Sequence, residues 1–505
     1  MSKKQCIYIS IALLALAAGI ILTLVFTNTT VRLTMTTDGC SPDPLVLSSA
    51  TRTIQVVNNS QRGDFIILDN SGSAVVTSSD MYNGTVRDVP VHLKTGYYTI
   101  QCGSDQYQTQ LTVGTPDTQN VDLGSTEASK SVLNSAGNNY VVTNLVANKA
   151  RYNPEIVDPT LLDAWGLASR PAGADGHFWV ASNRAGTSLE YVGDVGDTPL
   201  YQNDLRTVSI PGAAADSSLP ADASDLGTPT GIVFNPFQDR FIVDQGAVKG
   251  PAKFIFAGQD GTISAWTEQT TNNGTVNRLG WATRVADASE NGEQYFGIAI
   301  SPKGDKILTA DFGYHPAIRS FDTSFKPIQT AGFANPFTKD NENPAVNDWA
   351  PWNVTTLGDK VYVAYVQVGQ ETDDVGMVPA IGEENHAVGS GRIVEYDNDG
   401  KLIKILQDKS SLNAPWGVAI APAGFGRFTG ELLVANFGDG TISAFKKNGS
   451  FDDWLRDDKG RVIVVPGIWA LVPGNGGTLG SGNSMYFTAG PNGERDGVFG
   501  KINLR

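Results

Sequence analysis

Cysteine, histidine and charged residues are scarce in this chain of 505 residues. It has 3 Cys and 4 His, and only 18% of its residues are Asp, Glu, Lys or Arg. The 37 basic residues face 52 acidic ones, and the resulting net charge of −15 argues against general binding to nucleic-acid phosphates. The apolar fraction of 41% is ample for a packed core and excludes disorder as the general state.

Several catalytic signatures are absent as well. The sequence has no G-x-S-x-G nucleophile elbow, no H-E-x-x-H zinc motif, no P-loop and no G-x-G-x-x-G. The histidines lie far apart, at His92, His177, His315 and His386. Glycine is abundant, with 55 residues, and many glycines with few charges favour a β-rich fold with tight turns. We therefore expect an all-β fold and predict no cofactor.

The N-terminal segment contains one long uncharged run. Residues 6–26 follow Lys3 and Lys4, and about twenty apolar residues are enough to cross roughly 30 Å of hydrocarbon. We interpret 6–27 as an uncleaved transmembrane signal anchor with a cytoplasmic tail at 1–5, so that the bulk of the chain is periplasmic or extracellular. A cleaved signal peptide is the alternative, and it exports the rest of the chain equally.

Residues 30–114 form short alternating stretches separated by Gly, Pro, Asn and Asp, a pattern that predicts a small β-sandwich. Cys40 and Cys102 lie here, residues 103–505 contain no cysteine, and two cysteines in one small exported domain predict a disulfide. A polar linker is expected at 115–138.

The sandwich segment resembles the cupredoxin-like domain at the N-terminus of periplasmic iron-uptake lipoproteins. The matching runs are VRLTMTTDGCSPDPLVL, TIQVVNNS and LKTGYYTIQCGSDQYQTQLTVG, and Cys40 and Cys102 match that family's cysteine pair. Type 1 copper is not expected, because no His or Met follows Cys102 in the last loop. Another metal site that uses Asp38, Asp43 or His92 and a purely structural role are the alternatives.

Six N-x-S/T sequons occur in the sequence, and a chain rich in Asn, Ser and Thr contains several by chance. They do not establish glycosylation. Their asparagines are Asn28, Asn58, Asn83, Asn273, Asn353 and Asn448.

Residues 139–505 contain an internal repeat. Each copy begins with an aromatic residue or Thr, continues with Gly or a small residue, and is followed by an apolar alternation and further apolar strands. Copies recur at intervals of 53 to 66 residues. They begin at Trp165, Thr230, Phe296, Trp352, Trp416 and Trp469.

Six such units predict a six-bladed β-propeller, because a sheet with two apolar faces needs a neighbour on each side and a closed ring supplies both. We expect the Gly after the leading aromatic to let the inner strands crowd at the axis, and the aromatics to pack between blades. The segment 140–148 has no blade of its own and is predicted to be the outer strand of the last blade, which closes the ring. In the second blade FIVDQ is taken as the second strand, and KFIFAG and TISAWT compete as the third.

The repeat region resembles NHL-type propellers, and it is still closer to an uncharacterised family of secreted propeller proteins of bacteria. The matching motifs include DAWGLA, GTPTGIVFN, AKFIFAGQDGTISAW, APWNV, LNAPWGVAIAPAGFGRFTGELLVANFGDGTISAF and GNSMYFTAGPNGERDGVFG. This resemblance implies the fold and brings no activity with it.

A propeller usually binds ligands at the mouth of its channel, and polar residues that follow the second strands are candidates for such a site. Ca²⁺ takes oxygen ligands of this type, as it does in six-bladed lactonases, whereas Asx residues also cap β-turns. Both interpretations stay open for the predicted ligand-binding residues Asn183, Asp244, Asp311, Asn353 and Asn436.

Two further features could belong to such a mouth. The insert 366–391 is acidic and is either a lid, a metal-binding loop or a solvated loop. Its ionisable residues are Glu371, Asp373, Asp374, Glu383, Glu384 and His386. Trp349, Trp352 and Trp416 either stack on sugars or pack between blades.

The sequence thus predicts a membrane-anchored extracytoplasmic protein whose propeller binds a protein or glycan partner or serves as a scaffold, and which is not an enzyme. The second hypothesis is a Ca²⁺-dependent, lactonase-like hydrolase. The third, suggested by the resemblance of the small domain, is an accessory protein in iron or copper handling.

Overall fold

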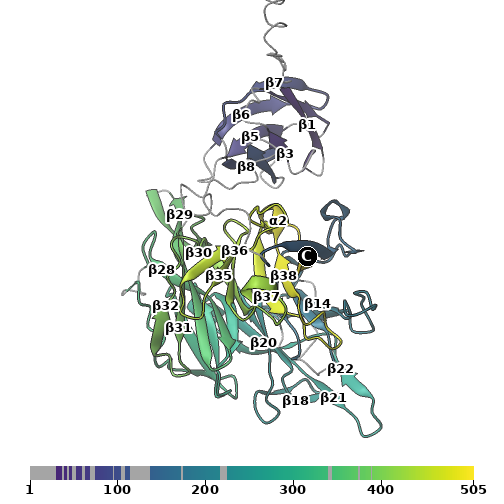
Figure 1. Cartoon of the computed structure of the whole chain (residues 1–505), viewed down its shortest axis with the longest axis vertical. Coiled ribbons are helices and arrows are strands. Elements are labelled where there is room, and N and C mark those ends of the chain that lie inside the picture. Colours follow the sequence, from purple (N-terminus) through teal and green to yellow (C-terminus); the bar gives the residue numbers. More distant parts are fainter. Residues whose placement is uncertain are drawn as a thin grey trace, which may run out of the picture. The chain divides into compact units, whose positions relative to one another are not determined.

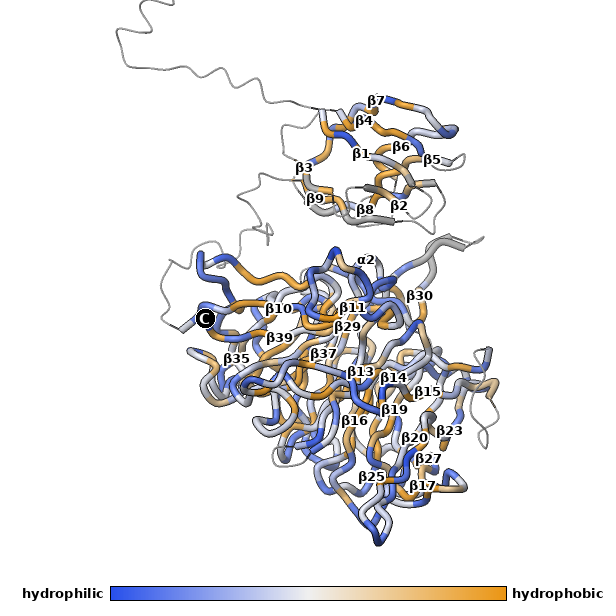
Figure 2. The backbone as a smooth tube through the Cα atoms, turned by 90° about the vertical axis from the view of Figure 1, so that its right-hand side faces the viewer, coloured by the Kyte–Doolittle hydropathy of each residue, from blue (hydrophilic) through white to orange (hydrophobic). Residues whose placement is uncertain are grey.

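The computed structural model describes two compact units, Met1–Val121 and Asp122–Arg505. The described residues are 30–36, 39–41, 45–47, 53–59, 63–68, 74–94, 96–103, 108–113, 137–171, 175–215, 224–338, 344–373, 376–387 and 389–505. Strands dominate both units (Figure 1), and apolar segments concentrate in the strands while polar ones occupy the turns (Figure 2). The predicted anchor 6–27 and most of the predicted linker lie outside the described residues. Within them, no helix is long and apolar enough to span a bilayer.

The first unit is a sandwich of two sheets, β2-β1-β4-β7 and β3-β9-β8-β5-β6, which bury one common apolar cluster. The strands are β1 (Thr30–Thr36), β2 (Gly39–Ser41), β3 (Leu45–Leu47), β4 (Thr53–Asn58), β5 (Gly63–Leu68), β6 (Ala74–Met81), β7 (Val86–Pro90), β8 (Gly96–Gly103) and β9 (Gln108–Val113). Cys40 of β2 and Cys102 of β8 form a disulfide with Cα atoms 5.8 Å apart, which confirms the predicted pair. His92 is exposed, and Asp38 and Asp43 lie outside the described residues. The cupredoxin resemblance stays a prediction.

The second unit is a β-propeller, and its described residues form six sheets of four or five strands. Blade 1 contains β12 (Ala164–Ala168), β13 (Phe178–Ser182), β14 (Thr187–Tyr191) and β15 (Thr207–Ser209). Blade 2 contains β16 (Pro229–Phe234), β19 (Phe254–Gly258), β20 (Thr262–Trp266) and β23 (Thr283–Asp287). Blade 3 contains β24 (Tyr295–Ile300), β25 (Lys306–Asp311), β26 (Ala317–Asp322) and β27 (Pro327–Ile328).

The other three blades follow the same order. Blade 4 contains β28 (Trp349–Leu357), β29 (Lys360–Asp373), β31 (Gly391–Tyr396) and β32 (Leu402–Ile405), with β30 (Gly376–Glu384) paired to β29. Blade 5 contains β33 (Pro415–Ile420), β34 (Leu432–Asn436), β35 (Ile442–Phe445) and β36 (Phe451–Trp454). Blade 6 contains β37 (Ile468–Pro473), β38 (Met485–Ala489) and β39 (Val498–Leu504). The short helical turns are η2 (Ala150–Tyr152), η3 (Asn183–Ala185), η4 (Ser289–Asn291), η5 (Gly426–Phe428) and α2 (Pro491–Glu494).

The ring is closed by the early strand β10 (Tyr140–Ala147). It pairs antiparallel with β39, from Tyr140 opposite Leu504 to Ala147 opposite Val498, and carries the two-residue strand β11 (Ile156–Val157) on its other side. The inner strands contact one another in the circular order β12, β16, β24, β28, β33, β37 and back to β12. Because this circle leaves neither face of any inner sheet without a neighbour, the apolar strands are buried on both sides.

Blade 2 differs from the sequence prediction. Its second and third strands are β19 and β20, whereas FIVDQ forms β17 (Ile242–Asp244), which pairs with β18 (Lys249–Pro251) in a separate hairpin. A second added hairpin, β21 (Glu268–Thr270) with β22 (Val276–Arg278), connects β20 to the outer strand. The apolar run of FIVDQ is as strong as that of KFIFAG, so the sequence alone did not show which of the two forms the second strand of the blade.

The glycines after the leading aromatics fit the prediction of crowded inner strands. A Cβ on Gly166 would overlap the carbonyl oxygen of Thr230, and one on Gly417 would overlap that of Trp469. Each of these atoms belongs to the inner strand of a neighbouring blade, so the close approach itself requires glycine.

We therefore expect Gly166→Ala to lower the free energy of unfolding by about 1–3 kcal/mol, because neighbouring blades must move apart. Gly280→Ala is the control, since its added Cβ would meet only one atom at an ordinary van der Waals distance of 3.8 Å. Chemical denaturation of both variants measures the difference. Equal stability of the two variants would contradict the crowding argument.

Candidate functional site

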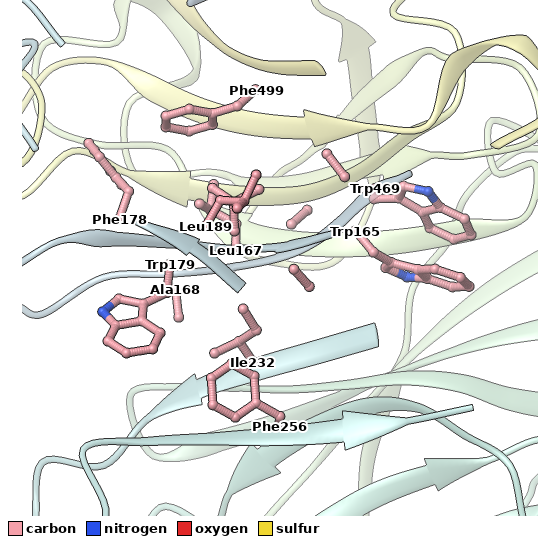
Figure 3. Packing of buried hydrophobic residues seen from close by; sticks show 14 of the residues in the cluster. Trp165, Leu167, Ala168, Phe178, Trp179, Leu189, Ile232, Phe256, Trp469 and Phe499 are labelled. Atoms are coloured by element: carbon pink, nitrogen blue, oxygen red, sulfur yellow. The ribbon is translucent and has the colours of Figure 1, made fainter. Parts of the chain in front are cut away.

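The leading aromatics of the repeats meet at the propeller axis, where they form a closed aromatic floor. Trp165 and Trp469 stack with ring centroids 3.8 Å apart (Figure 3). Trp165 also contacts Trp416 at 6.4 Å, in a blade that is not its neighbour. Trp352 contacts Trp469 at 5.3 Å, and Phe437 stacks on Trp469 at 3.9 Å. The stack of Trp165 on Trp469 joins the adjacent blades 1 and 6 and fits the expected packing between blades, while other contacts of these rings cross the axis. Burial at the axis excludes sugar stacking on Trp352 and Trp416, which are 0% and 5% exposed.

Trp349, the third tryptophan considered for sugar stacking, lies away from this floor. Its ring packs against Phe337 at 5.4 Å, and the Arg392 guanidinium lies 4.6 Å from its centroid. The underside of the floor faces a cavity of about 130 Å³ between the inner strands, which is lined by Trp416, Asn353 and apolar neighbours. A cavity of this size is too small for a ligand of ordinary size, so we consider the opposite end of the axis.

That opposite end, here called the mouth, is formed by the connections between second and third strands and by the residues that precede the inner strands. Four carboxyl groups from four blades converge there: Asp163, Glu384, Asp439 and Glu494. These groups lie close enough for their charges to shift one another's pKa. Burial and the charges of Glu384 and Glu383 raise the pKa of Glu494, and the charges of Arg184 and His386 lower it.

Glu494 is presented by an unusual backbone. Asn492, Gly493 and Glu494 are consecutive residues with φ of 62°, 57° and 62°, the left-handed region that non-glycine residues rarely adopt. Burial and the charges of Glu384 and Glu383 raise the pKa of Glu494 to about 7, against the opposing effect of Arg184. A carboxyl group with this pKa is half protonated near neutral pH, which is typical of functional sites.

Asp163 immediately precedes β12 and also has a positive φ, of 50°. Its side chain is 1% exposed and accepts a hydrogen bond of 3.1 Å from the Trp469 indole nitrogen, which connects the carboxyl cluster to the aromatic floor. Burial and the charge of Glu494 raise its pKa well above the usual range. Gly490 makes room for it, since a Cβ there would overlap the Asp163 carboxylate.

The β29–β30 hairpin brings two more groups to the mouth. The His386 Nε2 lies 2.5 Å from Glu384 Oε1, and its ring packs edge-on against Phe437 at 5.4 Å. Burial lowers the pKa of His386, but the charges of Glu384, Glu494 and Glu383 outweigh it and raise the net value. One interpretation of the insert 366–391 was a solvated acidic loop. It does not fit Glu384, whose side chain is only 8% exposed.

Asp439 completes the cluster from blade 5. It accepts hydrogen bonds from the Thr441 backbone nitrogen at 3.0 Å and from the Thr441 hydroxyl at 2.7 Å. Burial raises the pKa of Asp439 to about 6, although hydrogen bonds from Thr441 and Asn413 lower it. The Oδ1 atom of Asn413 is buried and has no hydrogen-bond partner among the described residues.

Four of the residues predicted from the sequence are buried near the axis and bind other parts of the protein. Asn183 donates to Gln259 Oε1 at 3.1 Å, and Asn353 donates to the Trp416 carbonyl at 2.7 Å. Asn436 donates to Ser411, Thr441 and Ser443. The contacts of Asn183 and Asn353 join neighbouring blades, and those of Asn436 lie within its own blade.

Asp311 also acts within the protein. It accepts hydrogen bonds from the backbone nitrogens of Gln294 and Gly313 and forms an ion pair with Arg319 at 2.8 Å. Burial raises its pKa to about 6. Asp244 lies elsewhere, on the β17–β18 hairpin, where it is exposed and paired with Lys249 at 2.9 Å. Gln259 occupies the position after the second strand of blade 2 that Asp244 was predicted to hold.

The mouth residues that the prediction missed stand at a different offset in every repeat. Asp163 precedes its inner strand by one residue, Asp439 follows its second strand by three, and Glu494 follows its second strand by five. Two features of the sequence could have indicated these residues. One is the turn sequence Pro-Asn-Gly-Glu, which is typical of a left-handed backbone, and the other is that every connection between a second and a third strand must lie at the mouth end. Only the closed ring brings these residues together.

A larger crevice of about 870 Å³ lies along the outer part of blade 3, beside β26 and the segment that follows β27. Its deeper polar groups pair with one another: the hydroxyl of Tyr295 with Glu293, and the hydroxyl of Tyr365 with that of Tyr396 at 2.8 Å. The mouth is the stronger candidate, since carboxyl groups from four blades converge there and the pKa values of Glu494 and Asp439 are raised to about 7 and about 6. Across the described ranges, no three His, Cys, Asp or Glu side chains form a group that could hold a metal ion.

No family model matches the sequence. An uncharacterized protein of Acanthamoeba polyphaga mimivirus is 26% identical over 366 residues, which cover 72% of this chain and 79% of that protein. A second from the same virus is 25% identical over 367 residues, which cover 72% and 84%. Both matches are similar to the present chain across most of their own length.

Solved structures with related topology have low overall similarity. Virginiamycin B lyase from Staphylococcus aureus is 12% identical and covers 72% of this chain and 100% of its own, with a TM-score of 0.37. A gluconolactonase from Xanthomonas campestris is 14% identical, covers 68% and 98%, and has a TM-score of 0.31. The propeller assignment rests on the sheet order and the circle of inner strands.

Proposed function

We propose that this chain is a membrane-anchored extracytoplasmic binding protein whose mouth takes a ligand with a positively charged nitrogen. The observation that supports this is the convergence of carboxyl groups from four blades above a closed aromatic floor. Such a nitrogen is present both in the lysine side chains of a protein partner and in the amino groups of a glycan. A scaffold role is compatible with this binding.

The charge balance at the mouth favours a cation. Burial and the charges of Glu384 and Glu383 raise the pKa of Glu494, whereas the charges of Arg184 and His386 lower it, and the net value is raised. Carboxylates in a partly desolvated site attract a cation more strongly than they do in bulk water.

The proposal predicts that amine-bearing probes bind the mouth and that their acetylated counterparts do not. A lysine oligopeptide and a glucosamine oligomer are titrated into the full chain by calorimetry, each beside its fully N-acetylated form. Glu384→Gln is expected to raise the Kd for the amine form at least tenfold, because a hydrogen bond to a charged group contributes about 1.5–3 kcal/mol.

The two amine probes separate a protein partner from a glycan partner. Asp239→Asn is the control, since this side chain is 73% exposed and lies in the connection after the inner strand β16, at the end opposite to the mouth. Equal affinity for amine and acetylated probes, or an unchanged Kd in Glu384→Gln, would contradict the proposal.

A hydrolase of the lactonase type, assisted by Ca²⁺, is the second candidate. The observation that favours it is the pair of carboxyl groups, Glu494 and Asp439, whose pKa values of about 7 and about 6 suit proton transfer near neutral pH. Lactone turnover that depends on added Ca²⁺ and disappears in Glu494→Gln would support it. A role in iron or copper handling depends on the sandwich resemblance alone and draws no support from its described side chains.

A further inference from the structure

The structure separates five of the six sequons into two groups, and the sixth, Asn28, lies outside the described residues. In N-glycosylation the Asn side-chain nitrogen is the group that is modified, and the attached glycan needs a surface position. Asn58 is fully buried and donates its Nδ2 to the Met81 carbonyl at 2.8 Å. Asn353 is 4% exposed and donates its Nδ2 to the Trp416 carbonyl at 2.7 Å. A glycan on either residue is incompatible with the folded chain.

Three other sequons lie at exposed turns. Asn448 stands between β35 and β36, and its Oδ1 accepts hydrogen bonds from the Ser450 backbone nitrogen at 3.0 Å and the Ser450 hydroxyl at 2.8 Å. Asn273 stands at the tip of the β21–β22 hairpin, with its Oδ1 accepting from the Thr275 backbone nitrogen at 3.3 Å. Asn83 lies in the exposed turn between β6 and β7. At Asn448 and Asn273 the oxygen, not the nitrogen, makes these contacts.

The two propeller sequons lie at the same end of the ring. Successive strands of a blade run antiparallel, so connections between third and fourth strands lie opposite to those between second and third strands. Asn273 and Asn448 are in the former, and the mouth residues Arg184, Asp439 and Glu494 are in the latter. Figure 1 shows β21 and β22 at the end of this unit opposite to α2. Glycans there would leave the mouth open.

We propose that Asn83, Asn273 and Asn448 are N-glycosylation sites and that the two propeller glycans cover the end opposite to the mouth. In this reaction Nδ2 forms a bond to C1 of an oligosaccharide carried by a lipid pyrophosphate. The bond between C1 and the pyrophosphate oxygen breaks, its electron pair leaves with the lipid pyrophosphate, and an Nδ2 proton passes to a base of the transferase. The inference rests on the export of the chain that the proposed function includes.

The test is translation of the full chain with endoplasmic-reticulum microsomes, followed by protease protection, glycosidase digestion and peptide mass spectrometry of the folded fraction. We expect one glycan to be lost in each of Asn83→Gln, Asn273→Gln and Asn448→Gln. Thr355→Ala removes the buried Asn353 sequon without changing the asparagine, and it is expected to leave the glycan number unchanged.

Export and glycosylation are distinguished by the protease result. A chain that is protected but carries no glycan at Asn273 and Asn448 would overturn the inference and leave export intact. A glycan on Asn353 in the folded fraction would also overturn it. If the chain is not protected, the proposed export fails, and the full chain behind a cleavable signal peptide then decides the glycosylation question by the same readout.

Discussion

Replacing Asp496 with alanine is expected to lower the free energy of unfolding of the propeller by roughly 3–5 kcal/mol, the range for removing one partner of a buried charge network. Its side chain is 1% exposed and lies where the closing strand meets the C-terminal segment. Asn148 donates to Asp496 at 2.8 Å and the Tyr152 hydroxyl donates at 2.7 Å, while Lys149 lies 3.0 Å away. Arg151 also pairs with this carboxylate.

These contacts join the beginning and the end of the ring. Four of the five residues 148–152 that follow β10 bind one carboxylate that precedes β39, and Ala150 is the exception. Without this carboxylate the positive charges of Lys149 and Arg151 are left uncompensated, and β10 loses its link to the segment before β39. We therefore expect β10 to detach first, which exposes the edge of β39. Hydrogen exchange of the β10 amides should then accelerate before global unfolding.

The pH dependence has a defined sign. Burial raises the pKa of Asp496, but the hydrogen bonds from Asn148, Tyr152 and Lys149 and the charge of Arg151 outweigh it, so the net pKa is lowered. A lowered carboxyl pKa contributes stability above the unfolded value of about 3.9, and this stability is lost as pH falls through the folded pKa. The difference between wild type and Asp496→Asn should therefore shrink at the lowest pH.

Asp458→Asn provides the matched control. Asp458 pairs with Arg505 at the same end of the chain, but both side chains are exposed, at 38% and 58%. An exposed pair contributes about 0–1 kcal/mol. Guanidinium denaturation of both variants gives the comparison. If Asp496→Ala unfolds at the same midpoint as the control, the carboxylate does not hold the ring closed.

The fold was predictable from the sequence because burial in a propeller repeats. Five of the six copies begin with an aromatic residue and four have Gly next, because the crowded axis favours both. The segment 140–148 belongs to no blade of its own, so its predicted place was beside the last strand, where it pairs with β39. The role of Asp496 could not be predicted in this way. In the sequence it looks like an ordinary turn residue, because its partners Lys149 and Arg151 lie far away in the chain and meet it only in the folded ring.

The mouth was less predictable for a related reason. Asn183, Asp311 and Asn436 follow their second strands at nearly constant offsets, and such regular positions serve the repeated architecture. The ionisable groups of the mouth are irregular: Glu384 comes from a hairpin found in one blade, and Glu494 from a turn found in another. A repeat pattern finds what the blades share, whereas a binding site depends on where they differ.

Glu494→Gln is expected to stabilise the protein and to weaken ligand binding at once. Its pKa is raised to about 7, whereas an unfolded glutamate titrates near 4.3, so ionisation above neutral pH opposes folding. At about 1.4 kcal/mol for each pKa unit, the neutral amide should raise the free energy of unfolding at pH 8 by roughly 3–4 kcal/mol. Below about pH 4.3 the two proteins should be equally stable.

Binding should change in the opposite direction. A cationic probe gains from Glu494 only when this carboxyl group is ionised, so the affinity of the wild-type protein for lysine oligopeptide should increase from pH 5.5 to 8, and in Glu494→Gln this increase should be smaller.

A structural carboxylate behaves differently, because its removal destabilises the fold. The left-handed backbone of Asn492, Gly493 and Glu494 adds to the same argument, since strain of this kind persists where function requires it. Denaturation and calorimetry at both pH values decide between the two roles: a Glu494→Gln protein that is less stable at pH 8 and binds the probe as wild type does would assign Glu494 to the fold, and the mouth would lose its central residue.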